Sequence, residues 1–292
     1  MFISCSSVAF SDSWLQPLIT KATTTPNTRP DTGLMLSVSF LLIAVPFAYS
    51  ASLFDSGLLP KFLALMIGAF LVVRSWMRME LRTETVRTSL LTDLPIFLYV
   101  LIVALQWPRA YDINEASLEV TKAFTLAFVY LAITRCSVEA HWRVWTSLLA
   151  VVGLVVSIIG ICQHLGIAFL SLPSAGFPSA TFAYRNIAAM FLITALPFAF
   201  LKFVWAGGRR DEVFWAACWT AMSLFLIYTR TRGAWVGWLV SSISVMALLI
   251  YRCGWGLLNP ERLLHSLRSS KGVVLLVAVL VIGAVSQVGP SA

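Results

Sequence analysis

The chain has 292 residues, of which 59% are apolar and only 12% are charged, and its formal net charge is +8. Its mean hydropathy is +0.85. A soluble domain has about 25% charged residues, and a soluble fold of this size could not bury so much apolar surface while covering itself with polar groups. The composition therefore excludes an ordinary soluble protein. It predicts an all-α fold, a polytopic bundle of transmembrane helices.

The N-terminal segment differs from the rest. Residues 1–32 are polar and rich in Ser and Thr, and they lack the ordered basic stretch, apolar core and cleavage site of a signal peptide. We expect a flexible polar cytoplasmic tail at 1–32, followed by a membrane domain at 33–292.

Apolar runs recur through this domain at the length that a bilayer core requires, about 20 residues per helix. They predict about nine spans, at residues 33–54, 58–73, 89–107, 116–134, 144–163, 186–206, 213–229, 233–251 and 272–288. The fourth is the weakest, because Glu119 and Lys122 lie in its first turns. Their spacing is that of an i,i+3 ion pair.

Basic residues set the orientation. With the N-terminus in the cytoplasm, most Lys and Arg residues fall in the inner segments, as the positive-inside rule requires. The exceptions, in the outer segments, are Lys61, Arg109, Lys122, Arg185, Arg230 and Arg232.

Three of these outer arginines fall in neighbouring segments. Arg185 closes the loop before the sixth span, and Arg230 and Arg232 lie in the tight connection before the eighth. A guanidinium near hydrocarbon is costly and normally has a partner or a function, and arginine binds phosphate in a forked, bidentate way. We predict that the three bind a diphosphate-bearing lipid. The alternative is that they extend to headgroup phosphates.

Two motifs around these arginines resemble the O-antigen ligase and O-antigen polymerase family. The segment 184–191 (YRNIAAMF), followed by ALP at 195–197, is similar to an Asn, an Ala-rich apolar helix and a Pro in that family. The segment 229–237 (TRTRGAWVG) is similar to the family's Ser-Arg-Gly-Ala-Trp-x-Gly. LPK at 59–61 is a weaker match.

The resemblance implies a membrane glycosyltransferase without a metal or other cofactor. Such proteins move a glycan from an undecaprenyl-diphosphate carrier to lipid A core or to another glycan, at the outer face of the bacterial inner membrane. It implies that Arg185 and Arg232, with the adjacent Arg230, bind the carrier diphosphate. Gly233 and Ala234 would allow close backbone approach. The implied partners are the lipid-linked glycan and membrane lipids, not nucleic acid.

The catalytic residues stay unassigned, because the family's large outer loop with its proposed general-base histidine is not evident. Among His141, His164 and His265, only His164 is expected near the outer face, as a helix-end residue. We expect an N-terminal part of such a fold, with a second chain as the source of the rest, and enzymatic activity stays open. The alternatives are a small-anion transporter, for which Gln163 and Pro197 are the modest pointers, and a non-catalytic remnant.

Other patterns have structural interpretations. Gly153, Ser157 and Gly160 share one face of the fifth span and predict close helix packing. Aromatic residues near span ends predict an interfacial belt; they are Trp107, Tyr111, Trp142, Trp145, Trp205, Tyr251 and Trp255. The five cysteines contain no CxxC pair, so neither a metal site nor a disulfide framework is indicated.

Overall fold

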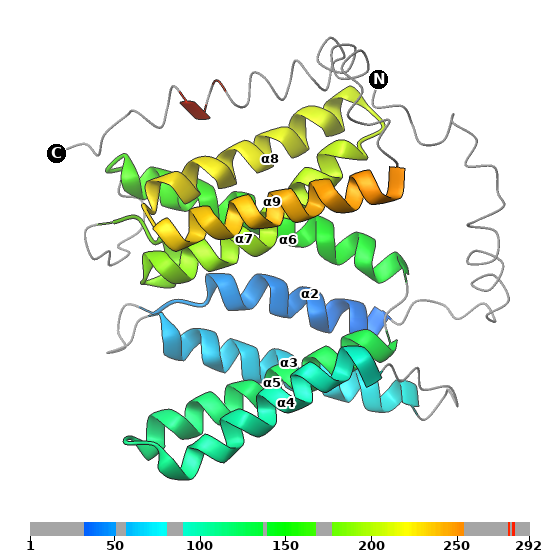
Figure 1. Cartoon of the computed structure of the whole chain (residues 1–292), viewed down its shortest axis with the longest axis vertical. Helices are drawn as coiled ribbons and strands as arrows, with labels where there is room; N and C mark the ends of the chain where they lie inside the picture. The colour runs from blue at the N-terminus through cyan, green and yellow to red at the C-terminus, as the bar shows by residue number, and fades with distance from the viewer. Residues whose placement is uncertain are drawn as a thin grey trace, which may run out of the picture. The chain divides into compact units, whose positions relative to one another are not determined.

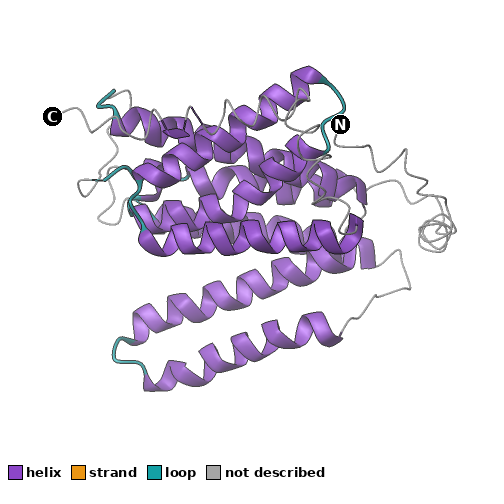
Figure 2. Ribbon diagram, turned by 45° about the horizontal axis from the view of Figure 1, so that its top comes forward, coloured by secondary structure: helices purple, strands orange, loops and turns teal. Residues whose placement is uncertain are grey.

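The computed structural model describes residues 32–50, 57–80, 90–136, 139–167, 177–253, 280 and 282–283. Over these residues it is helical and contains no strand (Figures 1 and 2). The α-helices are α2 (Thr32–Phe47), α3 (Leu58–Glu80), α4 (Leu90–Gln106), α5 (Ile113–Cys136), α6 (Glu139–His164), α7 (Arg185–Val204), α8 (Arg209–Tyr228) and α9 (Arg232–Cys253). Two 3-10 turns, η1 (Trp107–Arg109) and η2 (Ala180–Phe182), complete the order. The expected all-α class is confirmed.

The helices support a membrane-embedded chain, but not the expected count of nine spans. Four segments are long and apolar enough to cross a bilayer: Leu58–Arg78, Ile113–Thr134, His141–His164 and Arg185–Val204. α2 and α4 are apolar but have only 16 and 17 residues. α8 begins with four charged residues, RRDE. Most of the ninth expected span, 272–288, and residues 1–31 of the expected tail lie outside the described residues.

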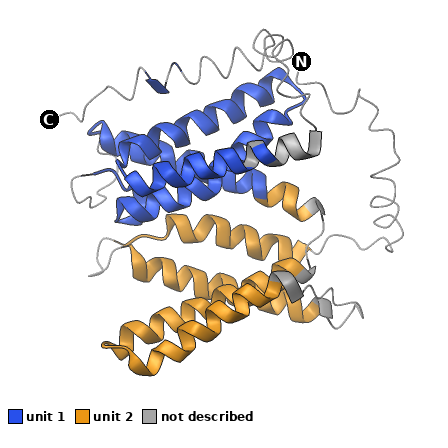
Figure 3. Ribbon diagram, in the orientation of Figure 1, with its two compact units in different colours: residues 1–28, 146–292 blue, residues 29–145 orange. Residues whose placement is uncertain are grey.

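The chain divides into two compact units, and α6 passes from one into the other (Figure 3). One unit comprises residues 29–145, and the other comprises residues 1–28 and 146–292. We call them the first and the second unit.

Apolar side chains from α2, α3, α5 and the first part of α6 form the core of the first unit. The buried members are Leu34, Val38, Leu41, Ala69, Val72, Val129, Ala132 and Trp145. Trp145 is only 4% exposed, and its indole Nε1 donates to the carbonyl oxygen of Met35 at 3.3 Å. The prediction that Trp145 belongs to an interfacial belt is therefore wrong, because the ring packs in the protein core.

Polar side chains of the first unit form hydrogen bonds with helix carbonyl oxygens and an ion pair with each other. The Lys61 ammonium donates to the carbonyl oxygens of Val45, Pro46 and Ala48, at 3.2, 2.7 and 3.0 Å, where α2 ends. The predicted pair of Glu119 and Lys122 forms, with 2.6 Å between Oε1 and Nζ. Both contacts keep a lysine paired close to apolar helices.

Small residues let α6 pack closely in the second unit. A Cβ at Gly153 would overlap Met222, and one at Gly160 would overlap the Phe225 ring. Ser157, between them on the same face, is fully buried and donates to the Gly153 carbonyl oxygen at 2.7 Å. The predicted packing face of α6 is confirmed.

Candidate functional site

Four helix ends of the second unit meet at one place. The end of α6 contacts the loop that enters α7 through hydrogen bonds from Ser179 and Ala180 to Gln163. It contacts the end of α8 through the stacked rings of His164 and Tyr228. The start of α9 contacts the start of α7, because Thr231 Oγ1 donates to Asn186 Oδ1 at 3.4 Å. These contacts bring together segments that are far apart in the sequence.

The loop that enters α7 is tightly wound. Ala180 and Ala183 have φ values of 48° and 63°, a region that residues with a Cβ rarely adopt. The Phe182 amide donates to the Ser179 carbonyl oxygen at 3.1 Å, and the Tyr184 amide donates to the Phe182 carbonyl oxygen at 2.7 Å. Phe182 is buried and lies against Phe191, with ring centroids 5.3 Å apart. The loop thus presents extended Tyr184 and then Arg185, which begins α7.

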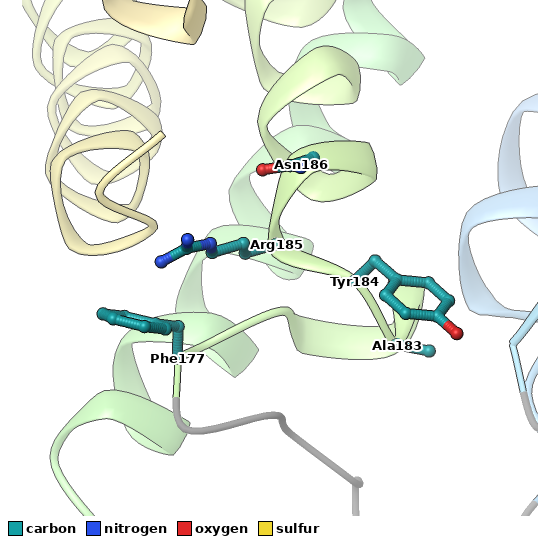
Figure 4. Close-up of a pocket in the computed structure, with 5 residues that line it drawn as sticks. All are labelled: Phe177, Ala183, Tyr184, Arg185 and Asn186. Atoms are coloured by element: carbon teal, nitrogen blue, oxygen red, sulfur yellow. The ribbon is translucent and has the colours of Figure 1, made fainter. Parts of the chain in front are cut away.

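Arg185 lies at a pocket of about 230 Å³. Its guanidinium carbon is 4.1 Å from the centroid of the Phe177 ring. The pocket is lined by Phe177, Ala183, Tyr184, Arg185 and Asn186. Figure 4 shows the Arg185 side chain above the Phe177 ring, whereas the Tyr184 ring points the other way. A guanidinium held over an aromatic ring by a cation–π contact can still donate its N–H groups to a ligand.

The other two predicted arginines lie beside this pocket but do not line it. Arg230 is exposed and has a φ of 49°, at the turn after α8. Arg232 is exposed and begins α9. Because Thr231 between them contacts Asn186, both arginines belong to the same end of the unit as Arg185.

This end of the unit is electropositive. The carboxylates of the described part of the second unit are those of Asp211 and Glu212, in the first turn of α8. α8 ends at Tyr228, so they lie about 25 Å from its other end. The dipoles of two helix starts and two helix ends roughly offset each other here, so the guanidinium groups dominate the field. Among the described residues, no carboxylate pairs with any of the three arginines.

His164 is the last residue of α6, as predicted for a helix-end histidine. Its ring stacks on Tyr228, with centroids 3.9 Å apart and planes inclined by 20°. It does not line the pocket.

The expectation for Gly233 is wrong. A Cβ added there would meet no atom of a neighbouring element within 4 Å, so the described structure gives no packing reason for glycine at this position. The neighbouring Ala234 is 4% exposed and fits the expected packing at the start of α9.

Two residues of the site were not predicted for it. Phe177 carried no signal beyond its place between Gly176 and Pro178, and Gln163 was singled out only as a pointer to transport. An amide near the end of an apolar helix was the one available hint for Gln163, because such ends have backbone groups nearby that need partners.

Comparison of the chain with family models, with curated proteins and with solved structures finds no match. The chemistry of the site therefore carries the functional argument.

Proposed function

We propose that this chain binds the diphosphate of an undecaprenyl-diphosphate-linked glycan at the outer face of the bacterial inner membrane. The proposed topology keeps the two expectations drawn from the sequence, an N-terminus in the cytoplasm and about nine spans. The observation that carries the proposal is the set of three arginines, Arg185, Arg230 and Arg232, at helix ends where no described carboxylate pairs with them. The sequence motifs at the same residues agree with this assignment.

The distribution of Lys and Arg over the whole sequence supports the orientation. The end of α7 and the start of α8 contain Lys202, Arg209 and Arg210, and a basic inner end is what the positive-inside rule requires. In the proposed orientation the arginines of the candidate site, at the other ends of these helices, lie outside.

The proposed chemistry is O-antigen-ligase-like glycan transfer. An acceptor hydroxyl on lipid A core or on another glycan attacks the anomeric carbon, and the bond from that carbon to the diphosphate oxygen breaks. The diphosphate leaves with the electron pair, and the guanidinium groups stabilise its growing charge. The hydroxyl proton passes to a base, a role for which we assign no residue.

Binding of pyrophosphate and of undecaprenyl diphosphate to the purified full chain tests the proposal. A hydrogen bond to a charged group contributes roughly 1.5–3 kcal/mol, so Arg185→Ala and Arg232→Ala should each weaken binding by about tenfold or more. Arg209→Ala and Arg210→Ala, at the other end of α8, are matched controls and should bind normally. Equal binding by Arg185→Ala, Arg232→Ala and the wild type would refute the proposal.

Transport of a small anion is the second candidate, because the same guanidinium groups could bind bicarbonate. Transporters usually bind their substrates near the membrane midplane, between broken helices. α7 continues without a break through Pro197, and Gln163 lies one residue from the end of α6. Neither residue therefore marks a broken helix. Rapid bicarbonate uptake by proteoliposomes containing this chain alone would favour transport. A non-catalytic remnant predicts neither uptake nor a glycan-transfer defect after gene deletion.

A further inference from the structure

The Gln163 side chain satisfies two buried backbone groups. Its carbonyl oxygen Oε1 accepts hydrogen bonds from the amides of Ser179 and Ala180, each at 2.9 Å. Ser179 and Ala180 are each only 1% exposed. A buried N–H group without an acceptor is costly, so the Gln163 carbonyl determines where these two residues can lie.

The backbone that follows is held in an unfavourable conformation. The left-handed φ values of Ala180 and Ala183 persist in proteins only where the surroundings over-determine them. Two contacts of the described residues do so here. Phe182 packs against Phe191 of α7, and Gln163 holds Ala180 against the end of α6.

The same backbone aims Arg185. Phe177 precedes the residues that Gln163 holds, and Arg185 follows them, so a shift at Ser179 and Ala180 moves both ends of the guanidinium–ring contact. The distance of 4.1 Å between the guanidinium carbon and the ring centroid thus depends on a side chain that does not line the pocket.

We propose that Gln163 is a positioning residue that holds the 177–185 segment so that Arg185 meets an anion at the pocket. The identity of the anion as a diphosphate rests on the proposed function. The role of Gln163 in holding the 177–185 segment does not. A neutral amide suits the role, because it accepts two hydrogen bonds without placing a negative charge beside the arginines.

Amide hydrogen exchange of the full chain in detergent tests the conformational part directly. Gln163→Met has a similar length but no acceptor, and Gln163→Asn keeps the amide on a shorter side chain. Both should speed exchange in peptides covering 179–182 by roughly tenfold or more, since two hydrogen bonds are lost. Gln163→Glu keeps the acceptor and should keep the protection. Gln106→Met, at the exposed end of α4, is the matched control and should change nothing in these peptides.

Pyrophosphate affinity of the same proteins tests the positioning part. Gln163→Met and Gln163→Asn should weaken binding by about tenfold, whereas Gln106→Met should not. Unchanged exchange in 179–182 for both Gln163→Met and Gln163→Asn would overturn the proposal. Faster exchange with unchanged affinity would overturn the positioning role. A wild-type chain that does not bind pyrophosphate would instead refute the proposed function, and the exchange pattern alone would then decide whether Gln163 holds the segment.

Discussion

The rings of His164 and Tyr228 stack with centroids 3.9 Å apart and planes inclined by 20°. His164 ends α6, and Tyr228 ends α8, so the stack joins two helices at the point where their chains leave for the arginine-bearing segments. Tyr228 is 4% exposed, and the contact is therefore inside the protein. The stack holds the ends of α6 and α8 together, and the chain segments that follow these ends carry the arginines of the candidate anion site.

Replacing Tyr228 by Leu should lower the thermal stability of the chain, because a buried aromatic contact is lost. Aromatic pairs contribute about 0.5–1.5 kcal/mol beyond burial. Tyr228→Phe keeps the ring and should lose much less. Tyr99→Leu, at a residue that is 58% exposed in α4, is the control. Thermal unfolding in detergent measures all three, and equal melting temperatures for Tyr228→Leu and Tyr99→Leu would show that the stack adds no stability.

Replacing Phe177 by Leu should weaken pyrophosphate binding by about twofold to thirtyfold, since a cation–π contact contributes roughly 0.5–2 kcal/mol. Phe177→Trp keeps an aromatic face under Arg185 and should bind as the wild type does. Phe214→Leu, in α8 at 43% exposure, is the matched control. Isothermal titration measures the affinities. If Phe177→Leu binds as tightly as Phe214→Leu does, the ring has no part in presenting the guanidinium.

Local patterns in the sequence predicted much of this structure. Each of the eight α-helices in the described part of the chain overlaps an expected apolar run, because burial of apolar residues has a length and a period that a sequence displays. The pair of Glu119 and Lys122 and the packing face at Gly153 and Gly160 were predictable for the same reason. They depend on spacing within one helix.

Contacts between distant segments were not predictable. Nothing local indicates that Gln163 meets the amide of Ala180, or that Ala183 has a positive φ, because alanine gives no signal for that conformation as glycine does. The sequence pattern of a tryptophan at a span end is the same whether the ring faces lipid or the protein core, and Trp145 faces the core. The motif around Gly233 predicted close helix packing, although the space beside this glycine is open.

Lys61→Met should destabilise the first unit by about 1–3 kcal/mol, because three carbonyl oxygens at the end of α2 lose a donor. Lys122→Met removes a lysine from an ion pair with Glu119, which is 59% exposed. Such surface pairs contribute only about 0–1 kcal/mol. Urea unfolding of both variants in detergent compares them. A Lys61→Met chain as stable as Lys122→Met would mean that water replaces the lysine at the helix end.

Gly160→Ala should destabilise the second unit by about 1–3 kcal/mol, because its Cβ would overlap the Phe225 ring. Phe225 is 0% exposed, so the ring has no open space to move into. Gly233→Ala is the matched control and should be neutral or slightly stabilising, since its Cβ meets nothing within 4 Å and alanine is the better helix former. Phe225→Leu makes room at the contact, so Gly160→Ala should cost less in that background. A double-mutant cycle of unfolding free energies measures this coupling. If the losses of the two single variants add up in the double variant, the strain caused by Gly160→Ala does not arise at the Phe225 ring.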